Sequence, residues 1–318
     1  MIVKKARLTL IILLPIFFWY GYSLISAYTE GDQRSYRLLY EALADAEPLE
    51  VIALANAYVG ASEPISAYLL WAGATLGIDK DFYIALLNVL LLVGIFLLGK
   101  RYSVGVIPLF LLLTNFYVIV LMTGAERLKI AYLLLIWAVL WGGKKEIVLV
   151  GMSPLAHLQN FILFPGLLLA NAADSIKHLV FSAKLKKRFF FTTGIVLVLL
   201  AVIFPFLCEA VLRKATVYLS LDITPFEIVN LVVLSAIAFV ATKDRWRMAL
   251  ALIPMYPAVY LIGGSRLNMI AVTLALFFLM KERVLNHPLV MALLIYFSLK
   301  SIPFVQKIFN YGNGFIRV

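Results

Sequence analysis

Two arginines lie where their side chains can bind an anion at the edge of a membrane. Arg127 follows Gly124 and opens an apolar run, and Arg266 follows Gly263-Gly264-Ser265 and opens another. A helix N-terminus attracts anions through its dipole and its free N–H groups, and a guanidinium can bind phosphate through two parallel hydrogen bonds. Two such arginines suit a diphosphate. The alternative for Arg127 is a side chain that only extends to the lipid headgroups.

Three residues are candidate general bases, in the order His157, Glu63 and Asp32. His157 is the one histidine inside an apolar stretch, and imidazole exchanges protons near neutral pH. Each has a structural alternative: a hydrogen bond across a helical hairpin for His157, a helix cap for Glu63, and loop positioning for Asp32. Arg34 and Arg213 are predicted to make secondary anion or sugar contacts.

The composition indicates the class of protein that holds these residues. Hydrophobic residues make up 64% of the 318 and charged residues 14%, against roughly 25% charged in soluble domains. One cysteine and three histidines give no basis for a disulfide framework or a metal site, and no cofactor is expected. The net charge of +11 is spread over short loops, which argues against nucleic-acid binding. These features predict a single all-α integral membrane domain over residues 1–318.

About ten or eleven transmembrane or re-entrant helices are expected. The predicted crossings span residues 8–27, 82–99, 103–122, 127–141, 189–207, 226–241, 248–262, 266–280 and 288–302. Residues 147–170 contain Pro154 and Pro165, and the loop that follows them is strongly basic. We therefore expect a helical hairpin that turns near His157.

Basic loops between the apolar runs predict a cytoplasmic N-terminus. The polar segment 28–81 carries nine acidic residues against three basic ones and is placed outside, with a short interfacial helix over 65–76. This topology brings all the candidate site residues to the external boundary: Asp32, Arg34, Glu63, Arg127, His157, Arg213 and Arg266.

In the order of these residues, the chain resembles the Wzy/EpsG-type polysaccharide polymerases of bacterial surfaces. The shared landmarks are G-D-Q-R-S-Y at 31–36, Glu63-Pro64, K-R-Y at 100–102, Arg127 with Ala131, the intramembrane His157, and the late Arg266. Two features depart from the family pattern. Glu126 adds a residue between Gly124 and Arg127, and Leu128 stands where the family commonly has Gln. Leu158 follows the histidine where a small residue is common.

The resemblance implies a GT-C-like O-antigen or exopolysaccharide polymerase of the inner membrane, with its active site on the external or periplasmic face. It would transfer a glycan chain from undecaprenyl diphosphate to a lipid-linked repeat unit. Arg127 and Arg266 would bind the diphosphate, and His157, Glu63 or Asp32 would take the acceptor proton. The implied partners are the lipid-linked oligosaccharide, membrane lipid, a chain-length regulator and a flippase.

Two other function classes stay open. One is a polyprenyl-phosphate-sugar glycosyltransferase or a glycan ligase, which would often carry paired acids in the first outer loop. Asp32 has only Glu30 near it in sequence. The other is a lipid-linked glycan flippase or transporter, for which internal repeats and charges at the membrane midplane are expected. No repeat is evident, and the predicted charges gather at one face.

Overall fold

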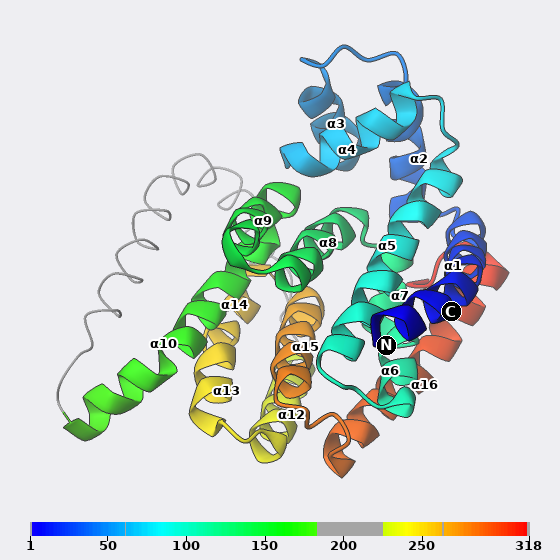
Figure 1. Ribbon diagram of the computed structural model, residues 1–318. Coiled ribbons are helices and arrows are strands. Elements are labelled where there is room, and N and C mark those ends of the chain that lie inside the picture. Colours follow the sequence, from blue (N-terminus) through cyan, green and yellow to red (C-terminus); the bar gives the residue numbers. More distant parts are fainter. Residues whose placement is uncertain (1, 61, 183–224, 263, 317–318) are drawn as a thin grey trace. The chain divides into compact units, whose positions relative to one another are not determined.

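The computed structural model describes residues 2–60, 62–182, 225–262 and 264–316, and over these residues the chain is entirely helical and turn, without strands (Figure 1). Four helical stretches in this part are long and apolar enough to cross a membrane: Thr9–Ala27, Lys80–Arg101, Val106–Thr123 and Pro288–Tyr311. The predicted all-α class is confirmed. The GT-C likeness and the count of ten or eleven crossings stay predictions.

The chain divides into two compact units. Unit 1 comprises Met1–Asn160 and Met291–Val318, and unit 2 comprises Phe161–Val290. The boundary falls just after His157, so the two arms of the predicted hairpin, α9 (Gly143–Ala156) and α10 (Leu163–Ser182), belong to different units. The hairpin and the single membrane domain stay predictions. The helix break expected near His157 is present, because η1 (Leu158–Ile162) separates α9 from α10.

Unit 1 is built on a series of packed helices. α1 (Ile2–Ala27) packs on α5 (Lys80–Arg101), α5 packs on α8 (Glu126–Trp141), and α8 packs on α9. A Cβ atom at Gly21 would lie 2.9 Å from the Cβ of Asn88, so glycine lets α1 approach α5 closely. At 16 residues, α8 is shorter than the roughly 20 that a perpendicular crossing needs.

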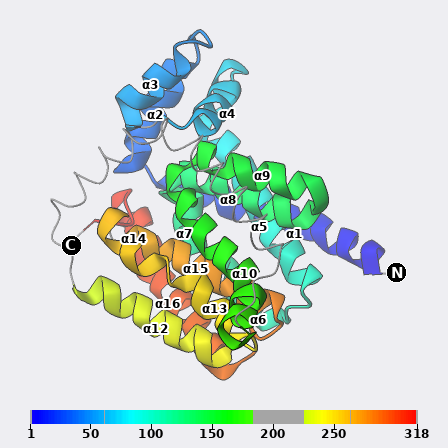
Figure 2. The ribbon, with the colours of Figure 1, turned by 90° about the vertical axis from the view of Figure 1, so that its left-hand side faces the viewer.

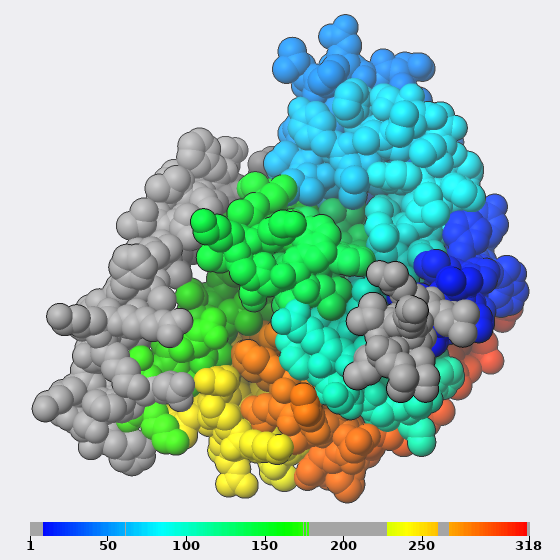
Figure 3. Space-filling view, viewed as in Figure 1, coloured from blue at the N-terminus to red at the C-terminus, as the bar shows by residue number. Residues whose placement is uncertain are grey.

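Three short helices occupy the polar segment 28–81. Only the helix over 65–76 is predicted from the sequence, and α4 (Pro64–Thr75) lies there. The structure adds α2 (Asp32–Leu43) and α3 (Val51–Val59), which pack on each other and on α4. Buried residues recur along α2 at helical spacing, Gln33, Tyr36, Leu39, Tyr40 and Leu43, as expected for a helix with one buried face. Figure 3 shows this segment as a continuous blue-to-cyan surface.

The predicted crossing over 103–122 is interrupted. Its two helices are α6 (Val106–Leu113) and α7 (Phe116–Thr123), and Asn115 caps α7 by accepting a hydrogen bond from the backbone N–H of Tyr117 at 2.9 Å. An asparagine cap satisfies an N–H group that would otherwise lack a partner. α16 (Pro288–Tyr311) runs beyond the predicted end at 302, and its Phe297 packs edge-on against Tyr117.

In unit 2, α15 (Gly264–Lys281) packs against α12 (Pro225–Ala241), α13 (Arg245–Leu252) and α14 (Met255–Ile262), as Figure 2 shows. The predicted crossing over 248–262 is divided between α13 and α14. A Cβ atom at Gly166 of α10 would lie 2.5 Å from the carbonyl oxygen of Ala251, so glycine permits close contact of α10 with α13. The predicted crossing over 189–207 lies outside the described residues.

Candidate functional site

The Glu63 carboxylate lies at the centre of the candidate site in unit 1. Glu63 immediately precedes α4, yet its side chain makes no cap hydrogen bond to that helix. Its Oε2 atom instead lies 2.8 Å from Nη1 of Arg127, and its Oε1 atom accepts a 3.4 Å hydrogen bond from the backbone N–H of Leu158. The structure therefore replaces the helix-cap alternative with a tertiary ion pair.

Arg127 lies in the first turn of α8, and contacts from two other helices orient its guanidinium. Its Nε donates to the hydroxyl of Tyr36 on α2 at 2.9 Å, and Nη1 binds Glu63. The side chain is only 17% exposed, so it does not simply extend to lipid headgroups. In the part of the chain that the structure describes, its Nη2 has no hydrogen-bond partner.

His157 completes the cluster from the extended residue between α9 and η1. Its Nδ1 lies 3.5 Å from Oε1 of Glu63, and its Nε2 lies 3.0 Å from Oε1 of Gln159. Nδ1 therefore faces the Glu63 carboxylate and Nε2 faces the Gln159 amide, and either ring nitrogen can carry the proton of the neutral imidazole. Burial lowers the pKa of His157 below its ordinary value of 6.5, although the nearby Glu63 carboxylate opposes this shift. Burial therefore favours the neutral form of the ring.

A second buried cluster adjoins the first and was not among the predicted site residues. We call it the lysine–glutamate network: Gln33, Lys80, Glu126, Lys129 and Asn88. Lys80 Nζ lies 2.6 Å from Oε1 of Gln33 and 3.2 Å from Oε1 of Glu126. The Gln33 amide donates to the same Glu126 oxygen at 2.8 Å and to the carbonyl of Thr123.

Lys129 extends the network toward α5. Its Nζ donates to Oδ1 of Asn88 at 2.9 Å, and its side chain is fully buried. Burial alone would raise the pKa of Glu126, but Lys80 and Lys129 hold it below its ordinary value. Lys80 therefore pairs directly with Glu126, and Lys129 adds a second positive charge nearby. The sequence could have pointed to this network, because Lys129 and Asn88 lie inside apolar runs and polar residues there are functional candidates by default.

The remaining predicted site residues are not brought to this cluster. Asp32 and Arg34 lie in the first turn of α2 with exposed side chains, and within the described ranges neither side chain makes a hydrogen bond. Arg213 lies outside the described residues. Arg266 belongs to the first turn of α15 in unit 2, and its side chain is not described. A diphosphate pocket shared with Arg127 therefore stays a prediction.

The cluster of Glu63, Arg127 and His157 can transfer a proton beside an anion. A carboxylate and a neutral imidazole are both able to accept a proton, and the guanidinium next to them is positively charged. This side-chain geometry is the whole basis for a functional assignment. No protein-family model, curated protein or solved structure matches this chain.

Proposed function

We propose that this chain is a membrane glycosyltransferase that polymerises lipid-linked saccharide units on the external face of the cytoplasmic membrane. The observation that carries the proposal is the meeting of Glu63, Arg127 and His157, which come from three separate segments of the sequence. Each was expected at the external membrane boundary, and the Glu63 carboxylate contacts both of the other two side chains. A base beside an arginine is the arrangement that transfer from a diphosphate carrier requires.

In the proposed reaction, an acceptor hydroxyl oxygen forms a bond to the anomeric carbon of the donor glycan. The bond from that carbon to the diphosphate oxygen breaks, and the lipid diphosphate leaves with the bonding electron pair. The acceptor proton passes to Glu63 or His157. Arg127 stabilises the developing negative charge on the diphosphate, for which its unpaired Nη2 is available.

The Glu63–Arg127 pair gives these two roles a physical connection. While Glu63 is ionised, it competes with the diphosphate for the Arg127 guanidinium. When Glu63 takes the acceptor proton it becomes neutral, and its attraction for Arg127 falls. The guanidinium then interacts more strongly with the leaving group at the moment when that group gains charge. Arg266 remains the proposed second arginine for the diphosphate.

The test is a polysaccharide gel of a deletion strain complemented with single variants. Arg127→Ala and Arg266→Ala should each abolish long chains while single repeat units remain on the lipid or the final acceptor. Arg127→Lys should also be impaired, because an ammonium cannot replace the planar guanidinium. Arg245→Ala is the matched control, since Arg245 is exposed and its described contact is with Phe239.

Membrane abundance of every variant is measured alongside, so that loss of the protein is not taken for loss of activity. A normal ladder of chain lengths from well-expressed Arg127→Ala would refute the role of this residue at the diphosphate. Glu63→Gln and His157→Asn distinguish which of the two candidate bases accepts the proton. Full polymerisation by His157→Asn would leave His157 a structural role and assign proton transfer to Glu63.

A further inference from the structure

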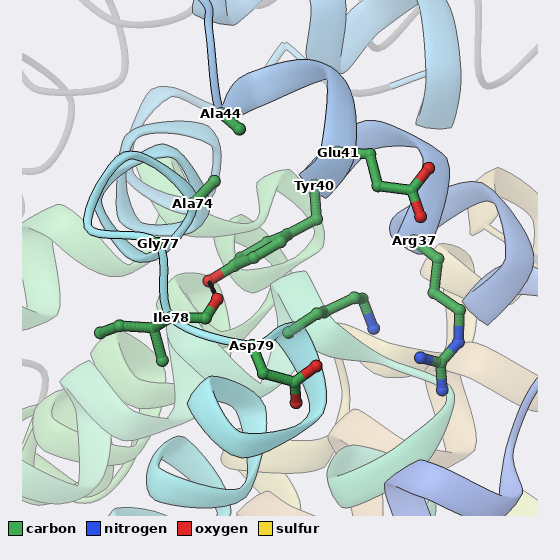
Figure 4. A pocket seen from close by; sticks show the side chains of 9 residues that line it. Arg37, Tyr40, Glu41, Ala44, Ala74, Gly77, Ile78 and Asp79 are labelled. Atoms are coloured by element: carbon green, nitrogen blue, oxygen red, sulfur yellow. Dashed lines mark hydrogen bonds between the residues drawn. The ribbon is translucent and has the colours of Figure 1, made fainter.

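A pocket of about 410 Å³ lies in unit 1 between α2, the C-terminal end of α4 and the beginning of α5. Its size is within the range of small-molecule sites. Figure 4 shows Tyr40 between Arg37 and Glu41 on one side and the turn that ends α4 on the other. The lining residues that matter here are Arg37, Tyr40, Glu41, Ala44, Asp79 and Lys80.

The two cations of this pocket are already paired. Arg37 lies 2.9 Å from a carboxylate oxygen of Asp81 and also donates to the carbonyl of Ile25. Lys80 is held by Gln33 and Glu126. An anionic ligand such as a phosphate would therefore compete with existing carboxylate partners.

The groups that remain available are carboxylate oxygens. The Glu41 side chain is exposed and has no hydrogen bond among the described residues. Asp79 uses Oδ1 to cap α5 at the backbone N–H of Phe82, which leaves Oδ2 available. Within the described ranges no three metal-ligating side chains gather, and Ca²⁺ needs six to eight oxygens. The available groups therefore suit a ligand that donates hydrogen bonds, such as a sugar with its hydroxyls.

The pocket is connected to the proposed active site through two elements. Lys80 lines the pocket and binds Glu126, the residue next to Arg127 in the first turn of α8. Along α2, Tyr36 contacts Arg127, while the following turn supplies Arg37, Tyr40 and Glu41 to the pocket. A substrate that places its diphosphate at Arg127 therefore has a polar pocket close by for its saccharide.

We propose that this pocket is a saccharide-binding subsite for the glycan part of a lipid-linked substrate. The proposal rests on the proposed function for the identity of the ligand. Glu41 and Asp79 accept hydrogen bonds from sugar hydroxyls, and Tyr40, whose hydroxyl donates to the carbonyl of Ile78, fixes the wall of the pocket between them. The diphosphate stays at Arg127, because the free carboxylates of the pocket repel an anion.

The test uses the full chain in lipid nanodiscs and saturation-transfer NMR. The probe is the mixture of saccharides released by mild acid from the surface polysaccharide of the source strain. Ala44→Trp fills the pocket without removing a hydrogen bond, and Glu41→Gln/Asp79→Asn removes the charge of its free carboxylates. Wild-type protein should bind the saccharides, and each variant should bind at least about tenfold more weakly.

Two matched controls lie beside the pocket without lining it. Leu76→Trp places the same side chain at an exposed residue just after α4, and Asp45→Asn removes an exposed acid just after α2. Both should bind saccharide like wild type. Inorganic pyrophosphate should not displace the saccharides. Absence of binding by the wild type, equal binding by Ala44→Trp, or displacement by pyrophosphate would each overturn the subsite.

These outcomes separate the subsite from the proposed function. Arg127→Ala should retain saccharide binding while it loses polymerisation. If Arg127→Ala polymerises normally but Ala44→Trp still loses saccharide binding, the polymerase mechanism fails and the pocket stands as a saccharide site. If polymerisation needs Arg127 but Ala44→Trp binds saccharide like wild type, the subsite fails and the proposed function stands.

Discussion

Replacing Glu126 by glutamine is expected to destabilise the protein more than replacing Lys80 by methionine. Glu126 is the one carboxylate of the lysine–glutamate network, and it is fully buried beside Lys80 and Lys129. Glu126→Gln leaves two buried ammonium groups without a counter-ion. Lys80→Met leaves one buried carboxylate and one buried lysine, whose charges balance. Glu126→Gln increases the net buried charge, so it should lower the free energy of unfolding more than Lys80→Met does.

The magnitude of this effect has an upper bound, because a lysine without a partner can lose its proton. At pH 7.5, removing the proton from one ordinary lysine, with a pKa of about 10.4, costs roughly 3 pKa units at 1.36 kcal/mol each, or about 4 kcal/mol, and this bounds the contribution of Lys80, the direct ion-pair partner of Glu126. Removing one partner of a buried ion pair typically costs about 3–5 kcal/mol. Glu126→Gln should therefore lose about 4 kcal/mol, and for domains of this size the melting temperature shifts by about 2–4 °C per kcal/mol.

The pH dependence makes the test specific. Between pH 7.5 and 9.5, the cost of removing the lysine proton falls by about 2.7 kcal/mol. The loss of unfolding free energy in Glu126→Gln relative to wild type should therefore become smaller over this pH range. The corresponding loss in Lys80→Met should not. Thermal unfolding followed by intrinsic fluorescence in detergent or nanodiscs measures both. Glu126 is not a proposed catalytic group, so the result does not depend on the reaction.

Two results would refute this reasoning. If Lys80→Met proved as destabilising as Glu126→Gln, the balance of one carboxylate against two lysines would not control the stability of the network. If the Glu126→Gln deficit stayed constant from pH 7.5 to 9.5, the unpaired ammonium groups would not be its cause. The double variant Glu126→Gln/Lys80→Met, with one buried lysine, should be more stable than Glu126→Gln alone.

The neutral form of His157 and the hydroxyl of Tyr36 give two further predictions. Because burial lowers the pKa of His157 in the folded state, the unfolded chain binds the proton more readily. The free energy of unfolding of the wild type should therefore be constant with respect to this group above about pH 6.5. Below that pH it should fall by up to about 1.4 kcal/mol per pH unit. In His157→Gln, the melting temperature should depend less on pH between pH 7.5 and 5.5 than it does in the wild type. An unchanged dependence on pH would assign it to other groups. Tyr36→Phe removes the acceptor for Nε of Arg127 and should cost about 1–2 kcal/mol. Combined with Arg127→Ala in a double-mutant cycle, it should show no additional cost, and full additivity would contradict the contact.

Sequence reasoning found the centre of the candidate site because charges in an apolar chain are few and expensive. Glu63, Arg127 and His157 were selected from membrane topology, residue chemistry and the family resemblance, and the structure joins Glu63 to the other two. Their mutual distances could not have been predicted. The approach of Glu63 to Arg127 depends on how α4 packs against α8 and α9, and no local pattern encodes that packing.

The missed features have a different physical origin. α2 and α3 were not predicted because the polar segment was interpreted by its charge and side of the membrane, although buried residues recur along α2 at helical spacing. The lysine–glutamate network was missed because Lys80 and Glu126 are at the ends of apolar runs, where charges ordinarily contact water or headgroups. Only the packing of α2 over the start of α5 and α8 turns these end positions into a buried network.

α2 is therefore the element on which the proposed site depends. Three residues of its buried face contact three different parts of the site: Gln33 the network, Tyr36 the Arg127 guanidinium, and Tyr40 the pocket. Their spacing of three and four residues places them along one side of a single helix. A rigid shift of α2 would disturb all three contacts together. Occupancy of the pocket and the position of Arg127 should consequently be coupled through this helix, with no requirement for movement of α8.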